Sequence, residues 1–134
     1  MTMRLAHRRL EGRRRMGMTT IRAGLASVHD PDRAADVETV VDSGAIYSIV
    51  PSAILRDIGV ESERAETFWL ADGRSVKRRV GHAVSAIAGR SGISNVIFGR
   101  AGDAPLLGML TLEALGLSLD PLKRRLRPLK LMIS

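Results

Sequence analysis

The sequence predicts a small, mostly β protein with two short helices, arranged as a barrel or a sandwich. Short segments rich in β-branched residues alternate apolar and polar side chains, which is the period of a half-buried strand. Turn residues, chiefly Gly, Pro and Asp, separate these segments at regular intervals. The length of 134 residues suits one domain, which can bury roughly two-thirds of its unfolded surface in a single core.

The first half of the chain predicts three strands and one helix. The strands are expected at residues 19–28, 37–41 and 46–50. Pro and Asp in residues 29–32 predict the turn between the first two strands. A helix is expected over residues 52–58, because Pro51 precedes it and Gly59 ends it.

The second half predicts a hairpin, further strands and a second helix. Residues 66–71 and 75–80 flank Asp72 and Gly73, and Asp-Gly is a strong hairpin signal. A helix is expected over residues 109–115, closed by Gly116. The remaining strands are expected at residues 82–89, 93–98, 106–108, 117–119 and 126–133.

The composition excludes several kinds of chemistry. The chain is 45% hydrophobic and has no cysteine, which excludes a disulfide framework, a thiol nucleophile and any Cys-ligated metal site. No apolar run approaches the roughly 20 residues that span a bilayer, and no signal peptide is recognisable. We therefore expect a cytoplasmic domain with no membrane partner.

Positive charge is concentrated in residues 1–17. The net charge is +7, and six arginines against one glutamate give this segment +5, which leaves +2 for residues 18–134. Three interpretations stay open: an arm that binds nucleic acid, an Arg-rich transit peptide, or an extension upstream of a start at Met16 or Met18. The segment has no core-forming pattern, so we expect a disordered or non-native arm followed by one domain.

The candidate chemistry lies in residues 40–45, VVDSGA. Asp42 follows an apolar strand, where its carboxylate can be partly desolvated while backbone N–H groups and the Ser43 hydroxyl hold its orientation. Asp-Ser-Gly is also an ordinary turn sequence. This motif alone therefore leaves a catalytic site and a plain turn both open.

A second motif changes the interpretation. Residues 105–108, PLLG, precede the second helix, and residues 116–120, GLSLD, follow it. Together with Asp42-Ser43-Gly44 and the hairpin, in this order, they resemble the retroviral-type (retropepsin-like) aspartic proteases, and the small stand-alone prokaryotic members most closely. The resemblance covers about residues 19–131.

The resemblance implies a closed, mostly β barrel with a psi-like loop crossing. The strand at residues 106–108 would lie against the Asp42 loop, and the helix that follows would support it. It also implies a homodimer, because the chemistry requires two aspartates and each chain supplies only Asp42. Peptide or protein would be the substrate, and no metal or organic cofactor is implied.

The resemblance also implies roles for single residues. Ser43 would form a hydrogen bond across the dimer beneath the carboxylates, and Gly44 would accept a substrate N–H with its carbonyl. The hairpin over residues 68–80 resembles the flap that closes over an extended peptide. Substrate-binding residues are expected at Ala45, Leu70, Ala71, Asp72, Gly73, Leu107 and Gly108.

Two departures bear on activity and specificity. Ser43 replaces the commoner Thr, which loses a methyl group but keeps the hydroxyl. The hairpin lacks a glycine-rich tip and is basic; its cations could favour an acidic peptide, but a solvated strand face is the better interpretation. Those cations are Arg74, Lys77, Arg78 and Arg79. Trp69 could be a substrate platform, although a role in the core or an interface is favoured.

Other functions are less well supported. None of His7, His29 and His82 has a partner at a ligand spacing, so no metal is expected. Ser43 lacks the Gly-x-Ser-x-Gly context of a hydrolase nucleophile. Two alternatives stay open: a catalytically silent peptide-binding or dimerisation module of this fold, and an RNA-associated protein that uses the Arg-rich arm. The low charge of residues 18–134 disfavours nucleic acid as a partner outside that arm.

Overall fold

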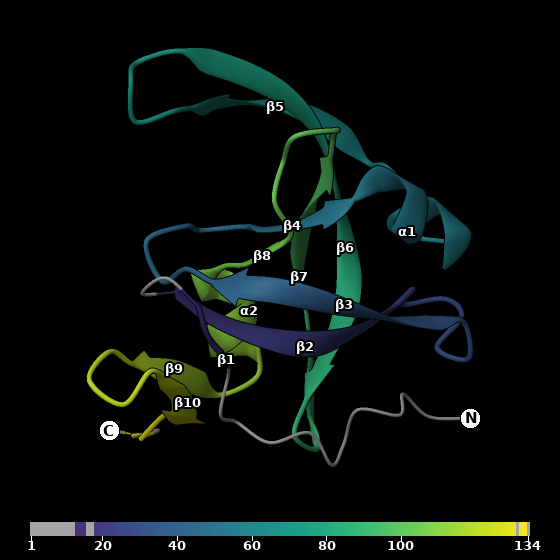
Figure 1. Ribbon diagram of the computed structural model, residues 1–134. Coiled ribbons are helices and arrows are strands. Elements are labelled where there is room, and N and C mark those ends of the chain that lie inside the picture. The colour runs from purple at the N-terminus through teal and green to yellow at the C-terminus, as the bar shows by residue number, and fades with distance from the viewer. Residues whose placement is uncertain (1–12, 16–17, 131, 134) are drawn as a thin grey trace.

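The structure is a computed structural model that describes residues 13–15, 18–130 and 132–133, and most of these residues lie in β-strands (Figure 1). The elements follow the chain as β1 (Arg13–Arg15), β2 (Met18–Ala26), β3 (Ala34–Val41), β4 (Ser48–Pro51), α1 (Ser52–Asp57), β5 (Arg64–Trp69), β6 (Ser75–Ile87), β7 (Arg90–Gly99), β8 (Leu106–Leu107), α2 (Met109–Ala114), β9 (Leu117–Asp120) and β10 (Arg125–Pro128). Neither of these helices is long and apolar enough to cross a membrane.

The strands of the main sheet lie in the order β1-β2-β3-β8-β4-β7-β6-β5, and β9 and β10 form a separate antiparallel pair. The sheet curves back on itself: β6, near one end of this order, also pairs with β2, near the other end. The short strand β8 lies between β3 and β4, parallel to β3 and antiparallel to β4. The segment that contains Asp42 joins β3 to β4, so it passes over the end of β8.

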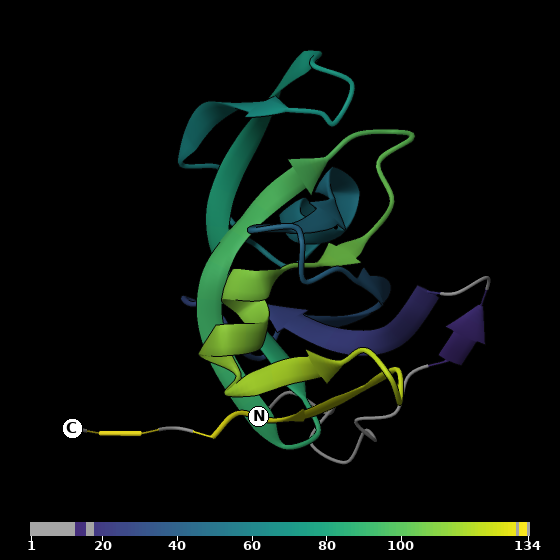
Figure 2. The ribbon, with the colours of Figure 1, turned by 90° about the vertical axis from the view of Figure 1, so that its left-hand side faces the viewer.

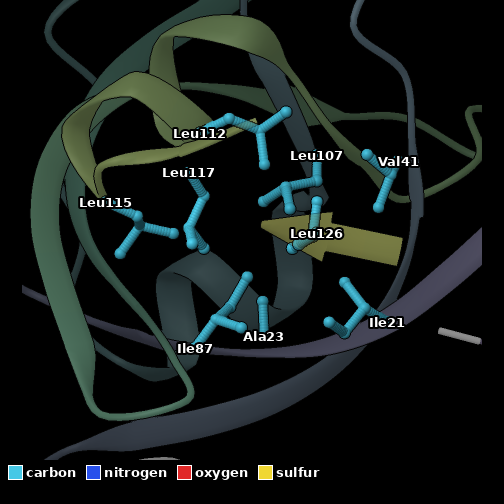
Figure 3. Close-up of a cluster of buried hydrophobic side chains, with 9 residues drawn as sticks. All are labelled: Ile21, Ala23, Val41, Ile87, Leu107, Leu112, Leu115, Leu117 and Leu126. Atoms are coloured by element: carbon cyan, nitrogen blue, oxygen red, sulfur yellow. The ribbon is translucent and has the colours of Figure 1, made fainter. Parts of the chain in front are cut away.

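Two clusters of buried side chains form the core. The first comprises Ile21, Ala23, Val41, Ile87, Leu107, Leu112, Leu115, Leu117 and Leu126 (Figure 3). The second comprises Leu25, Val37, Val50, Leu55, Ile58, Val60, Ala83, Val96 and Phe98. Val41 and Leu107 of the first cluster immediately precede Asp42 and Gly108. Each half of the candidate motif therefore begins at a side chain fixed in the packed core.

The largest difference from the sequence prediction is in β6. The segments expected at residues 75–80 and 82–89 are one continuous strand of 13 residues. Gly81 makes no turn there; instead, an added Cβ would lie 2.3 Å from the Glu61 carbonyl oxygen, so glycine permits a close approach. The turn to β7 is formed by Ala88 and Gly89, with φ of 51° and 80°. Alanine is unusual at such a position, which explains why the strand was expected to continue.

Other boundaries moved by a few residues. The strand expected over residues 37–41 begins at Ala34, and the one expected over residues 126–133 ends at Pro128. Both helices form where predicted, and the glycines that follow them have positive φ. Within the arm that was expected to be disordered, Arg13–Arg15 form β1 against β2. The rest of the arm lies outside the described residues.

Candidate active site

The backbone holds Asp42 at the end of β3. The Asp42 N–H donates to the Leu107 carbonyl at 3.0 Å, which continues the pairing of β3 with β8. One carboxylate oxygen, Oδ1, accepts a hydrogen bond from the Gly44 N–H at 2.9 Å. An added Cβ at Gly44 would lie 3.2 Å from the same oxygen, so a larger residue there would crowd the carboxylate. The tight turn thus fixes the direction of the acid.

The start of α2 supports the segment that follows Asp42. The Met109 N–H donates to the Ala45 carbonyl at 2.7 Å, and the Leu110 N–H donates to the Ile46 carbonyl at 3.1 Å. These are N–H groups of a first helical turn, which have no partner within a helix. An added Cβ at Gly108 would lie 2.6 Å from the Tyr47 carbonyl carbon. Glycine is therefore required for this contact.

A buried hydroxyl cluster, formed by Ser48, Ser94 and Thr111, lies behind the same segment. The Thr111 hydroxyl is 2.5 Å from the Ser48 hydroxyl and 2.8 Å from the Ser94 hydroxyl. The Ser48 oxygen also accepts the Gly108 N–H at 2.9 Å. The hydroxyl cluster links β4, β7 and α2 to Gly108. Sequence analysis missed it, because these residues lie far apart in the chain and no local pattern connects them.

The Asp42 segment is open to solvent in the single chain. Asp42, Ser43 and Gly44 are exposed, so the partial desolvation expected from the sequence is not present. Two large apolar residues near them in the fold are also exposed: 58% of the surface of Ile46 and 39% of that of Met109 is accessible to solvent. Exposed apolar side chains close in the fold to an exposed acid are what a second protein surface would cover.

The residues expected to bind substrate fall into two groups. Leu107 and Gly108 are buried, so they support the Asp42 segment from the core side and are not available to line a substrate site. Ala45 is half-buried beside Asp42. The exposed residues lie in the loop at the hairpin tip: Leu70, Ala71, Asp72 and Gly73. Figures 1 and 2 show the β5–β6 hairpin projecting above the segment that joins β3 to β4.

The hairpin has an inner and an outer face. The inner face carries half-buried side chains, among them Phe68 and Arg78, and it meets Tyr47 of the Asp42 segment. The Tyr47 and Phe68 rings contact edge to face, with centroids 5.8 Å apart and planes at 72°. The outer face carries exposed Lys77 and Arg79. The hairpin therefore turns the face that carries Phe68 toward Tyr47, in the segment that joins β3 to β4.

The hairpin cations are divided between these faces. Lys77 and Arg79 are exposed, as the solvated-face interpretation predicts. Arg78 pairs with Asp103 at 2.8 Å, and Arg74 pairs with Asp72 at 2.6 Å. The inner face consequently presents no cluster of unpaired cations that would select an acidic peptide. A core position for Trp69 is wrong, because 74% of this residue is exposed.

Two pairs of titratable groups away from Asp42 show pKa shifts. The His82 Nδ1 atom is 2.8 Å from a Glu63 carboxylate oxygen, and this hydrogen bond lowers the pKa of Glu63. Hydrogen bonds from Arg78 likewise lower the pKa of Asp103. In the described part of the chain, no three His, Asp or Glu side chains come together as a metal site would require.

Comparison with known proteins bears on the fold. No protein-family model and no curated protein sequence matches the chain. Among solved structures, it is similar to the solution structure of the Simian Foamy Virus (mac) protease, with a TM-score of 0.50 and 19% sequence identity. The chain has a retropepsin-like fold. The similarity covers 71% of this chain and 92% of the viral chain, and at this identity it concerns the retropepsin-like fold alone.

Proposed function

We propose that this protein is an aspartic-type endopeptidase that works as a homodimer. The observation that carries the proposal is the Asp42 segment: an exposed acid, directed by Gly44 and backed by β8 and α2, within a retropepsin-like fold. The sequence motifs support membership of the small stand-alone prokaryotic group, and a cytoplasmic location stays a prediction. The return pairing of β6 with β2 supports a closed barrel.

In this proposal, two Asp42 carboxylates meet across a two-fold axis. Two carboxylates so close cannot both ionise easily, so the pair shares one proton. One carboxylate removes a proton from water as the water oxygen attacks the peptide carbonyl carbon. The other carboxylate donates its proton to the carbonyl oxygen. Collapse of this intermediate breaks the C–N bond: one carboxyl gives its proton to the departing amine, and a hydroxyl of the intermediate returns a proton to the other carboxylate, so the pair again holds one proton.

The surroundings of Asp42 support the dimer. A single chain leaves the carboxylate in water and leaves Ile46 and Met109 exposed beside it. A second chain that covers these apolar side chains would also remove water from the carboxylates, which strengthens their coupling. Ser43 is exposed next to Asp42 and is available for the hydrogen bond across the axis.

The hairpin supports a role in binding extended peptide. Its inner face brings Phe68 toward the Asp42 segment, and its exposed tip, residues 70–74, extends beyond the contact with Tyr47. A peptide between the hairpin and Asp42 could form backbone hydrogen bonds with both, which is how strand-like recognition gains affinity. Closure of the tip would exclude water from the reaction.

The test replaces the acid by its amide. Asp42→Asn should abolish cleavage of an extended peptide library, because an amide cannot hold the shared proton, while circular dichroism and sedimentation stay unchanged. Asp57→Asn is the control, since Asp57 is an exposed acid at the end of α1. Cleavage retained by purified Asp42→Asn protein would contradict the proposal. A wild-type dimer that binds peptides but cleaves none would instead favour the silent module.

A further inference from the structure

We propose that a row of polar side chains holds the β5–β6 hairpin at a fixed distance from the segment that contains Asp42, and that Arg78 and Asp103 are positioning residues for substrate. This polar row comprises Arg64, Glu66 and Arg78 on the inner face of the hairpin, and Tyr47 and Asp103 on the neighbouring segments that they contact. The proposal rests on the proposed peptidase function for the substrate, but its structural part concerns the hairpin alone.

The ion pair between Arg78 and Asp103 is the strongest contact of the polar row. The Arg78 Nε atom donates to Asp103 Oδ2 at 2.8 Å, and Nη2 donates to Oδ1 at 3.1 Å. The two side chains are only 16% and 22% exposed, against 75% and 52% for Arg74 and Asp72 at the hairpin tip. A two-point, largely shielded pair holds geometry far better than an exposed ion pair does.

Asp103 connects this pair to β8, the strand that pairs with the end of β3 just before Asp42. The Arg100 N–H also donates to Asp103 Oδ2, at 2.8 Å, which fixes the carboxylate within its own loop. That loop continues through Pro105, whose carbonyl accepts the Val40 N–H at 3.1 Å, and into β8, which pairs with β3. Arg78 therefore ties the second strand of the hairpin to the segment that leads directly to the partner strand of Asp42.

The first strand of the hairpin is tied to the other side of the site. The Phe68 ring packs against Tyr47, and Arg64 Nη2 donates to the Tyr47 hydroxyl at 3.4 Å. Arg64 also pairs with Glu66 at 2.6 Å. The strand register sets Glu66 directly opposite Arg78, so charges of alternating sign run across the hairpin. Each hairpin strand is thus anchored to one of the two segments that frame Asp42.

The position of the polar row along the hairpin determines which part of the hairpin is free to move. It crosses the stem at residues 64–66 and 78, and the exposed loop over residues 70–74 lies beyond it. A fixed stem confines closure to the tip and keeps the hairpin at one distance from the Asp42 segment. Without the ion pair, the whole hairpin would pivot and a peptide would have to order it on binding.

The experiment compares Arg78→Gln, Asp103→Asn, the double variant and Lys77→Gln. Lys77→Gln is the matched control, because it removes a neighbouring cation from the exposed outer face. Each single variant at the ion pair should raise KM for an extended peptide about three- to tenfold, with kcat nearly unchanged, and should speed amide hydrogen exchange in β5 and β6. The amide introduced by Asp103→Asn keeps an oxygen for the Arg100 N–H, so the loop itself is preserved.

The double variant and a conservative variant sharpen the test. Loss of both partners should be no worse than loss of one, because no unpaired charge remains at a half-buried position. Arg78→Lys should fall between the wild type and Arg78→Gln, since an ammonium keeps the charge but not the two-point geometry. Lys77→Gln should match the wild type in both measurements.

The outcomes separate this inference from the proposed function. Unchanged hydrogen exchange in Asp103→Asn would overturn the inference, whatever the kinetics. Faster exchange with an unchanged KM would overturn the role in substrate positioning. A wild-type protein without peptidase activity would contradict the proposed function instead, while hydrogen exchange would still decide whether the polar row holds the hairpin.

Discussion

Thr111→Val should lower the free energy of unfolding, because it removes a buried hydroxyl in α2, the helix that supports the Asp42 segment. Thr111 is fully buried, and its hydroxyl is the middle member of the hydroxyl cluster with Ser48 and Ser94. Valine has nearly the same shape, so the substitution opens no cavity; it removes only the hydroxyl and its two hydrogen bonds. The effect therefore reports hydrogen bonding rather than packing.

The expected magnitude follows from the groups left without partners. Ser94 is 8% exposed and Ser48 is 2% exposed, so neither hydroxyl can turn fully to water. A buried polar group without a partner costs roughly 1–3 kcal/mol. Ser48 still accepts the Gly108 N–H, which limits its share of the cost. We expect the free energy of unfolding to fall by about 2 kcal/mol, out of roughly 5–15 kcal/mol for a domain of this kind.

The assay is urea unfolding followed by circular dichroism, with two comparison variants. Ser94→Ala removes one end of the hydroxyl cluster and should cost about 1 kcal/mol. Thr67→Val makes the same chemical change on the exposed outer face of β5 and should stay within about 0.5 kcal/mol of the wild type. A Thr111→Val protein as stable as Thr67→Val would refute the hydrogen-bonding role of this cluster.

Four further results are expected. Gly108→Ala should lower the free energy of unfolding by about 2 kcal/mol or more in urea titrations, because its Cβ would lie 2.6 Å from the Tyr47 carbonyl carbon. Ser43→Ala should reduce activity modestly and weaken the dimer in sedimentation; no change in either would exclude a hydrogen bond across the axis. Deletion of residues 1–17 should preserve fold and activity but remove most salt-sensitive binding to RNA in a filter assay. The lowered pKa of Asp103 stabilises the fold above the usual value near 3.8, and this contribution is lost as the pH falls through the lower folded value; the Asp103→Asn protein should therefore show a weaker dependence of stability on pH below about 4.

The motifs around Asp42 were predictable because short-range chemistry dictates them. An acid after an apolar strand, a glycine that permits a tight turn, and Leu-Leu-Gly before a helix are all local patterns. The structure brings the first and last of these together through the parallel pairing of Val41 with Leu107. That pairing connects residues far apart in the chain, and only the resemblance to a known family implied it.

The features missed by sequence analysis depend on distant contacts. Ser48, Ser94 and Thr111 form a cluster only because β4, β7 and α2 meet. Gly81 lies between the two strands expected at residues 75–80 and 82–89, yet it makes a close backbone contact inside one continuous strand. The sequence of the basic hairpin does not show which of its cations is paired, because the partner of Arg78, Asp103, lies 25 residues away in the chain. The type of a residue does not indicate whether its hydrogen-bonding or ion-pair partner is a neighbour in the chain or a distant residue that the fold brings close.

The shared-site mechanism is tested most directly by measuring activity per chain against protein concentration, alongside sedimentation of the same samples. If two Asp42 carboxylates form one site, specific activity must fall in step with the dimer fraction on dilution. It should also follow a bell in pH, since the coupled pair loses its base at low pH and its acid at high pH. Constant activity per chain at concentrations where sedimentation detects only monomer would contradict the mechanism, because one Asp42 cannot supply both the acid and the base.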